Sequence, residues 1–411
     1  MKVFLLCLLL LMMTSEISRA EEGFIDVTVP TGGKLRLSIE AAIPLSGPPA
    51  PELGRELREL FAFDLGLTGL FKVAGSQVGT SGTDLVLKTA YIVNGTGLTL
   101  ECRIFDAVQN RELIGKRYTG TRKDLRWMGH AFSDEVLRAR TGEKGPFTGE
   151  IAFVTKLSGN KEISVMDYDG RNVQRVTNNG SINLNPDFAP SGREIIYTSY
   201  KKGNPDLYRR ELFTGSETRI SARPGLNAMG AIAPDDSRTA LVLTKDGNSQ
   251  IYLISGTGRE LARLTRNSAI DVSPAWSPDG TKLAFVSDRL GKPQIFSMKA
   301  DGTNVKRLTL NGAYNVTPRW SPNNDRIVYA RKGGNGFQLF AINPDGSHDV
   351  QLTTRGSNEH PRWSPDGRFI VFSSTRDGGQ AIYLMRADGS GQTRVSRGKS
   401  VDSHPAWSLA G

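Results

Sequence analysis

Four histidines, His130, His348, His360 and His404, are the only imidazoles of the 411-residue chain, and their positions limit the chemistry open to them. The sequence contains no HExxH zinc motif, no GxSxG nucleophile motif and no GxxxxGK phosphate loop. His360 and His404 each precede the proline of a repeated motif and could bind one metal ion from adjacent repeats, but no third ligand repeats with them. We therefore expect no catalysis, no metal and no cofactor, and a structural role for His130.

A second group of residues is suited to binding rather than to catalysis. An asparagine or aspartate stands three residues before each motif proline or its equivalent. Short polar side chains of this kind can cap the backbone of their own loop, or they can line a surface that receives a partner. The sequence leaves both roles open and predicts exposed loop positions. The six residues are Asn183, Asn227, Asp271, Asn315, Asn358 and Asp402.

These polar residues belong to a repeat of about 44 residues. The aromatic position of the motif PxWSPDG recurs at spacings of 44, 44, 44, 43 and 44 residues. A second repeated position, the Thr or Ser that ends a short run such as RLT, recurs at spacings of 44, 44, 44, 44 and 43 residues. Each unit predicts four short strands with Asp-Gly turns, which is the size of a β-propeller blade. We expect the motif tryptophans to pack between blades rather than to stack on a ligand. The residues at the aromatic position are Phe188, Ile232, Trp276, Trp320, Trp363 and Trp407.

The count of strands predicts a closed ring of six blades over residues 145–411. In each unit, a first strand that carries the motif is followed by a second, apolar strand. The earliest second strand, near Ile151, has no motif strand before it. The final motif strand, residues 405–408, has no second strand after it. We expect the two halves to complete one shared blade, which leaves no sheet edge open. In this arrangement the polar residues lie in the loops that enter the innermost strands, near the central channel.

Residues 21–144 lack the repeat and predict a small α+β domain. Apolar residues at helical spacing predict a helix that begins near Pro51, and a second helix should run from 124 to about 139. Three runs, over 84–93, 97–106 and 111–120, predict antiparallel strands. The helical apolar residues are Leu53, Leu57, Leu60, Phe61 and Leu65.

The N-terminal 20 residues have the layout of a secretory signal peptide that is cut after Ala20. Export through this signal predicts a periplasmic or extracellular protein. Cys7 lies within the signal, so Cys102 is left without a disulfide partner, and its strand-like surroundings predict a buried thiol.

Taken together, the signal peptide, the small domain whose last helix carries WMGHAFSDEVL (127–137) and the six PxWSPDG blades resemble the TolB family, the periplasmic propeller proteins of the Tol-Pal envelope system. The second blade departs from the pattern, with Gly230 and Ile232 in place of Pro and Trp. The resemblance implies a non-enzymatic periplasmic scaffold that supports outer-membrane integrity and constriction during cell division.

The resemblance also implies two partners. The lipoprotein Pal would dock on the propeller's loop face, and the C-terminal domain of TolA would bind a mobile N-terminal arm, residues 21–29, that adds a strand to its sheet. The alternative for the arm is the first strand of the small domain. The predicted Pal-binding residues are Ile182, Asn183, Asn185, Asn227, Ala228, Met229, Asp271, Asn315, Asn358, His360, Asp402 and His404. The predicted TolA-binding residues are Glu21, Glu22, Gly23, Phe24, Ile25, Asp26 and Val27.

Two other classes of protein remain open at this point: an exported propeller that binds glycans or peptides, and a regulatory part of a hydrolase. The net charge of +10 could attract nucleic acid, an anionic envelope polymer or an acidic partner. Export and the scattered placement of Lys and Arg argue against nucleic acid. We expect a monomer that meets the membrane only through its partners.

Overall fold

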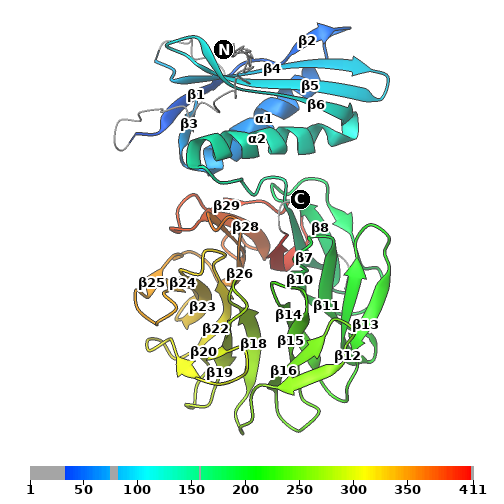
Figure 1. Cartoon of the computed structure of the whole chain (residues 1–411), viewed down its shortest axis with the longest axis vertical. Coiled ribbons are helices and arrows are strands. Elements are labelled where there is room, and N and C mark those ends of the chain that lie inside the picture. Colours follow the sequence, from blue (N-terminus) through cyan, green and yellow to red (C-terminus); the bar gives the residue numbers. More distant parts are fainter. Residues whose placement is uncertain (1–32, 75–81, 157–158, 409–411) are drawn as a thin grey trace, which may run out of the picture. The chain divides into compact units, whose positions relative to one another are not determined.

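The chain folds into a mixed α/β domain followed by a six-bladed β-propeller, as the sequence predicts (Figure 1). The structure is a computed structural model that describes residues 33–74, 82–156 and 159–408, so the predicted signal peptide and N-terminal arm lie outside the described residues. The domain bounds 21–144 and 145–411 stay predictions. Within the described ranges, none of the helices is long and apolar enough to cross a membrane.

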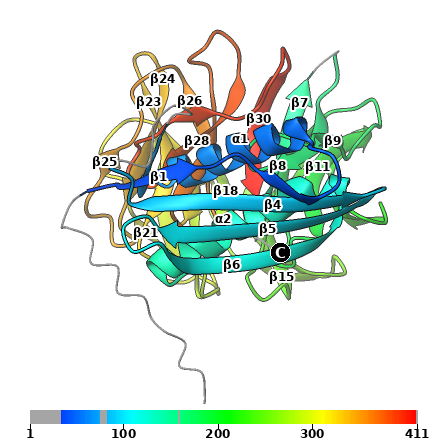
Figure 2. The ribbon, with the colours of Figure 1, turned by 90° about the horizontal axis from the view of Figure 1, so that it is seen from above.

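A mixed β-sheet forms the first domain, and Figure 2 shows its main strands side by side. The strand order is β3-β1-β4-β5-β6, and β2 also pairs with β4. The three predicted strands are confirmed as the antiparallel meander β4-β5-β6, whereas the parallel pairs made by β1, β2 and β3 were not predicted. The strands are β1 (Leu35–Ile39), β2 (Ile43–Ser46), β3 (Phe71–Val73), β4 (Leu85–Asn94), β5 (Gly97–Asp106) and β6 (Arg111–Thr121).

Both predicted helices are confirmed, as α1 (Pro51–Leu67) and α2 (Leu125–Thr141), with a 3₁₀ turn, η1 (Arg122–Asp124), before the second. All five apolar residues predicted to lie on one face of α1 are buried. The helices approach closely at Gly129, where a Cβ atom would lie 2.9 Å from Leu60 Cδ2. Gly142 caps the C-terminal end of α2, and its φ of +82° favours glycine.

Each propeller blade is a four-stranded antiparallel sheet. The innermost strand carries the motif, and in five of the blades it precedes the three outer strands in the chain. The five blades that are continuous in sequence are β10–β13 (Asn183–Phe188, Glu194–Lys202, Asn204–Glu211, Glu217–Ser221), β14–β17 (Asn227–Ile232, Arg238–Leu243, Gln250–Ser255, Glu260–Arg263), β18–β21 (Asp271–Trp276, Lys282–Ser287, Gln294–Lys299, Lys306–Arg307), β22–β25 (Asn315–Trp320, Ile327–Gly333, Gly336–Ile342, Val350–Gln351) and β26–β29 (Asn358–Trp363, Phe369–Ser374, Ala381–Arg386, Thr393–Arg394).

The sixth blade confirms the predicted closure of the ring. Its strand order is β30-β7-β8-β9, so the last strand of the chain, β30 (Val401–Trp407), is the innermost strand of the first blade. It pairs antiparallel with β7 (Glu150–Lys156), which is followed by β8 (Glu162–Asp167) and β9 (Gln174–Arg175).

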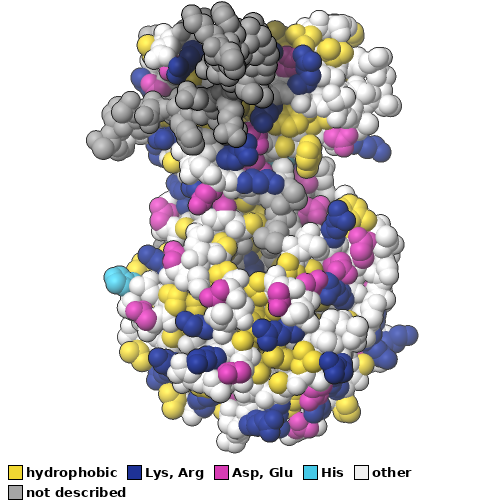
Figure 3. Space-filling view, in the orientation of Figure 1, with side chains coloured by type: hydrophobic (Ala, Val, Ile, Leu, Met, Phe, Trp, Pro, Cys, Tyr) yellow, Lys and Arg dark blue, Asp and Glu magenta, His cyan; other side chains and the backbone are white. Residues whose placement is uncertain are grey.

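Six hydrophobic clusters hold the ring together, one at each junction between neighbouring blades. The cluster at the closing blade also includes Leu67 from α1 and Leu137 from α2, which joins the first domain to the propeller. Over the face that Figure 3 shows, basic and acidic side chains are mixed rather than separated. The basic excess of the chain therefore does not form a nucleic-acid-like patch on that face.

Candidate functional site: the propeller channel

The six polar residues predicted to be exposed in loops are instead buried, with exposed fractions of 0 to 2%. Five begin the innermost strand of a blade, and the sixth is the second residue of β30. The prediction of exposure was wrong because each side chain points beneath its own loop and bonds backbone groups there, while most residues of the loop itself stay exposed. The residues that were predicted to be exposed and are buried are Asn183, Asn227, Asp271, Asn315, Asn358 and Asp402.

The polar side chains cap these loops, which was one of the two roles left open. Asn227 Nδ2 donates to the carbonyl of Arg223 at 2.7 Å and to that of Gly225 at 3.1 Å, and Asn315 Nδ2 donates to the carbonyl of Asn311 at 2.9 Å. The aspartates accept instead: Asp271 receives hydrogen bonds from Asn267 and Arg289. These residues hold the rim of the channel in place rather than facing a partner.

Two residues later, each innermost strand carries a β-bulge whose residue lines the channel. The six bulge residues have φ between +51° and +54° although none is glycine, and the pairing register shifts at this point in all six blades. A bulge redirects side chains away from the regular pleat. The residues are Asn185, Met229, Ser273, Thr317, His360 and His404.

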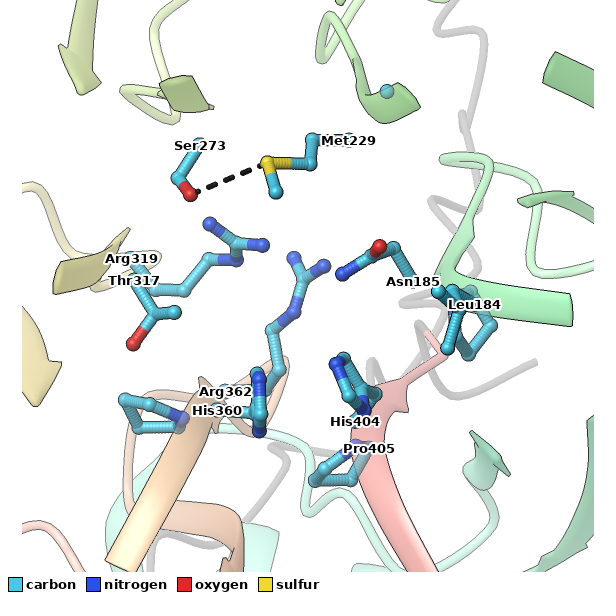
Figure 4. A pocket seen from close by; sticks show the side chains of 13 residues that line it. Leu184, Asn185, Met229, Ser273, Thr317, Arg319, His360, Arg362, His404 and Pro405 are labelled. Atoms are coloured by element: carbon cyan, nitrogen blue, oxygen red, sulfur yellow. Dashed lines mark hydrogen bonds between the residues drawn. The ribbon is translucent and has the colours of Figure 1, made fainter. Parts of the chain in front are cut away.

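We call the cavity that these residues enclose the channel site; its volume is about 220 Å³ (Figure 4). Arg319 and Arg362 project into it from neighbouring blades, and Figure 4 shows their guanidinium groups close together near its centre. Arg362 Nη1 lies 3.1 Å from Asp187 Oδ2 in an ion pair. Met229 accepts a long hydrogen bond of 3.5 Å from Ser273 Oγ.

The two histidines of the channel site are stacked on each other. Their ring centroids are 3.7 Å apart with an angle of 30° between the planes. Burial lowers the pKa of His404 to about 4, and the nearby cations Lys161, Arg362 and Arg319 act in the same direction. Burial, His404 and the same cations place the pKa of His360 well below its usual range. Both imidazoles are therefore neutral at pH 7, which lets them stack without repulsion.

The depressed histidine pKa values predict a stability loss in acid. Below pH 6.5 the unfolded chain takes up protons at these positions while the folded chain does not, so stability falls as the pH drops towards 4. For His404 alone the loss should reach about 2 to 3 kcal/mol. We expect His404→Asn to reduce this acid-dependent loss in the free energy of unfolding, measured with urea at pH 7, 5.5 and 4.5. Asparagine is the residue at the equivalent position of another blade, Asn185.

The matched control is His348→Asn, since His348 is an exposed histidine with a similar φ of +52°. This variant should retain the full acid sensitivity of the parent. An equal reduction of the acid-dependent loss in both variants, or none in His404→Asn, would contradict the assignment to the stacked pair.

The remaining predicted contact residues differ in exposure. Ile182 is 45% exposed, whereas Ala228 is 4% exposed and offers little side-chain surface. Asn185, Met229, His360 and His404 line the cavity. The structure thus brings four of the twelve predicted residues together around one cavity, leaves Ile182 exposed outside its lining, and places the six loop-capping residues and Ala228 in the interior.

Sequence reasoning missed Arg319, Arg362 and Asp187, the charged residues of the channel. All three occupy the repeat position directly before the motif aromatic. The other three blades have Ala231, Ala275 and Ala406 there. Comparing the six copies at this column would have found them, because a charge in a column otherwise filled by alanine is not explained by packing between blades.

The motif tryptophans pack between blades, as predicted. Trp276, Trp320 and Trp407 are 7 to 8% exposed. Trp276 Nε1 donates to the carbonyl of Ala231 at 3.0 Å, in the innermost strand of the preceding blade, and Trp363 makes the equivalent bond at 3.2 Å. These bonds and the low exposure of three of the rings agree with packing between blades.

The predicted burial of the Cys102 thiol is confirmed, and the contacts of His130 agree with the structural role predicted for it. Cys102 is fully buried, and burial raises the pKa of its thiol. His130 is buried on α2 and bonds Asp64 at 2.9 Å. The nearby carboxylates of Asp167 and Asp169 could contribute to a metal site with His130, but Arg126 already pairs with both of them. A metal ion would have to displace that guanidinium.

Comparison with known proteins agrees with this architecture. The family described as PD40, TolB beta propeller domain, matches residues 138–410. The Tol-Pal system protein TolB of Geobacter sulfurreducens is 54% identical over 208 residues, which are 46% of this chain and 48% of that protein. The protein of the same name from Geobacter metallireducens is 56% identical over 211 residues, 47% of this chain and 49% of that protein. The matched region thus spans about half the length of these curated relatives.

Solved structures support the fold of both parts. The crystal structure of TolB from Acinetobacter baumannii covers 92% of this chain and 97% of its own, with a TM-score of 0.81 at 24% identity. A chain of the nidogen/laminin complex matches 63% of this chain with a TM-score of 0.53 at 12% identity, so the propeller architecture is shared more widely than the sequence. Because the family match covers about two thirds of its residues, the chain belongs to the TolB β-propeller family.

Proposed function

We propose that this chain is a non-enzymatic component of the Tol-Pal system, located in the periplasm, that helps maintain outer-membrane integrity and supports constriction during cell division. The observation that carries the proposal is the family match over residues 138–410, together with relatives at 54 and 56% identity that are named Tol-Pal system proteins. The predicted signal peptide is consistent with a periplasmic location.

For the first partner, we propose that Pal docks over the channel site. The side chains available to it are the exposed Ile182 and the bulge residues Asn185, Met229, His360 and His404, which line one cavity. Concave surfaces on loops held by a rigid scaffold are common binding sites. The buried asparagines and aspartates support this surface from below and do not touch the partner.

Two substitutions at this surface should weaken Pal binding without unfolding the protein. In Ile182→Glu/Met229→Glu, the new carboxylates would repel an acidic partner and would lose solvation beneath any docked protein. We expect the dissociation constant for Pal, measured by calorimetry, to rise at least ~30-fold, which is about 2 kcal/mol.

The control variant Val173→Glu/Phe213→Glu adds the same charge at residues that are 58% and 84% exposed. Both lie between the third and fourth strands of their blades, at the opposite end of the strands from the channel site. Pal affinity should stay within about twofold of the parent value. Unchanged Pal binding by the folded Ile182→Glu/Met229→Glu protein would exclude this face as the docking surface.

For the second partner, we propose that residues 21–29 bind the C-terminal domain of TolA by adding a strand to its sheet. Deleting these residues should abolish TolA binding in a pull-down while Pal affinity and the melting temperature stay unchanged. The propeller strands all come later in the chain, so the deletion removes none of them. A large drop in melting temperature would instead make the arm a strand of the first domain.

A further inference from the structure

The channel site has more positive than negative charge. Arg319 and Arg362 enter it from β22 and β26, and Asp187 is the one carboxylate within ion-pair distance of either guanidinium in the described part of the chain. That carboxylate pairs with Arg362 at 3.1 Å, and Arg319 forms no ion pair of its own among the described residues, although it lies within the field of Asp187. Lys161 lies close enough to lower the pKa of both histidines and adds to the same positive field.

Arg319 has hydrogen-bonding capacity that the protein does not use. Its Nη1 donates to the carbonyl of Pro318 at 2.7 Å, while its buried Nε has no acceptor among the described residues. A guanidinium carries five N–H donors and remains charged near neutral pH. Burial and the Arg362 guanidinium lower the pKa of Arg319 to about 9, and the Asp187 carboxylate offsets this shift only in part, so the charged form of Arg319 is destabilised.

The rest of the channel site supplies space and neutral polar groups. Asn185, Ser273 and Thr317 line the same cavity, and both histidines are neutral at pH 7. In the three blades without a charged residue, the column of Arg319 and Arg362 is alanine, and these alanines pack into the clusters between blades rather than lining the cavity. The cavity of about 220 Å³ can therefore hold a small anion with some water, but not a nucleotide or a sugar chain.

We propose that the channel site binds a single oxyanion group, a carboxylate or a phosphate, between the guanidinium groups of Arg319 and Arg362. A guanidinium can donate two parallel hydrogen bonds to such a group. The bound charge would neutralise the unpaired Arg319 and satisfy its free donors. The proposal does not depend on the identity of the partners proposed above.

The oxyanion could come from two sources. It could be a free ion of the periplasm, or it could be the carboxylate of an acidic side chain of a protein docked over the channel. Both use the same chemistry at Arg319, so free phosphate and acetate are suitable probes of the site in the isolated protein. Competition with a docked protein then distinguishes the sources.

The test is a calorimetric titration of the purified protein with sodium phosphate and with sodium acetate, in a buffer that contains neither type of ion. We expect binding of both ions and a rise in melting temperature with their concentration. Arg319→Met should weaken binding at least ~10-fold. It should still fold, since it removes an unpaired cation and leaves the Arg362–Asp187 pair intact.

The control variant Arg266→Met removes the same charge from an exposed position in a loop that leads into an innermost strand. It should bind both ions as the parent does. Absence of binding by the parent, or equal weakening in both variants, would overturn the proposal. If saturating phosphate weakens Pal binding to the parent but not to Arg319→Met, the natural ligand is a partner's carboxylate. If phosphate binds and Pal affinity is unchanged, the ligand is a free ion.

Discussion

A chain that ends at residue 404 is expected to aggregate or to melt far below the parent protein. The missing residues 405–408 include the end of β30, which is the innermost strand of the shared blade. They pair with β7 at Ala406–Ala152 and Trp407–Ile151, and Ser408 exchanges hydrogen bonds with Glu150. Removing them opens the inner edge of a four-stranded sheet, which is a site for pairing with other chains.

The truncation also removes a large side chain from the closing junction. Trp407 is 8% exposed and stacks on Tyr168 with the centroids 6.0 Å apart. Loss of a buried aromatic side chain alone costs about 3 to 5 kcal/mol, which is a large part of the stability of a typical protein.

Thermal unfolding that is monitored together with light scattering measures both the loss of stability and the aggregation. A chain that ends at Ser408 is the matched control, because it keeps all of β30 and the Ser408 bonds. It should melt close to the parent. If the chain that ends at residue 404 also melted like the parent, β30 would not be needed to close the ring.

Repetition made the propeller predictable from one sequence. Because the repeat occurs six times in a constant register, each strand pattern could be compared across six copies. The unmatched first and last strands, near Ile151 and at 405–408, predicted the closure of the ring. The first domain offers a single copy of each element. The hairpins β4-β5-β6 have local turn signals, whereas β1 and β3 pair in parallel over more than 30 residues of sequence. Such a pairing depends on tertiary contacts that no local pattern reveals.

The channel site was predicted only in part, because the sequence gives the position of a residue in the repeat but not the direction of its side chain. The β-bulge changes that direction. Without it, a strict alternation along the innermost strand gives Asn183 and Asn185 the same environment. With it, Asn183 is buried under the loop and Asn185 lines the cavity. The bulge requires φ above +50° at residues such as Met229 and Thr317, which do not by themselves suggest such a backbone.

Substitution of Asp64, a fully buried carboxylate on α1, is expected to cause the second large loss of stability. It accepts a hydrogen bond from Tyr168, which follows β8 in the propeller, and bonds Nδ1 of His130 on α2 at 2.9 Å. One carboxylate therefore ties both helices of the first domain to the closing blade. Asp64→Ala would leave the histidine and the phenol buried without their partner. We expect a loss of about 3 to 5 kcal/mol in the free energy of unfolding.

The pH dependence of this loss identifies its origin. Burial alone lowers the pKa of His130, but the adjacent Asp64 carboxylate outweighs burial and raises it above 6.5. The stability gained from the pair is then fully present below pH 6.5 and is lost as the pH rises through the raised value. The penalty of Asp64→Ala, measured by urea unfolding, should therefore be larger at pH 6 than at pH 9.

Glu59→Ala is the matched control for this prediction. Glu59 lies on the same helix and also reaches the propeller, through an ion pair of 3.8 Å with Arg171, but its side chain is 62% exposed. Solvent screens such a pair, so its loss should change stability little at either pH. Asp64→Asn keeps the shape and one acceptor oxygen and should fall between the two variants. If Asp64→Ala were no more damaging than Glu59→Ala, or if its penalty grew with pH, the buried carboxylate would not be what couples the domains.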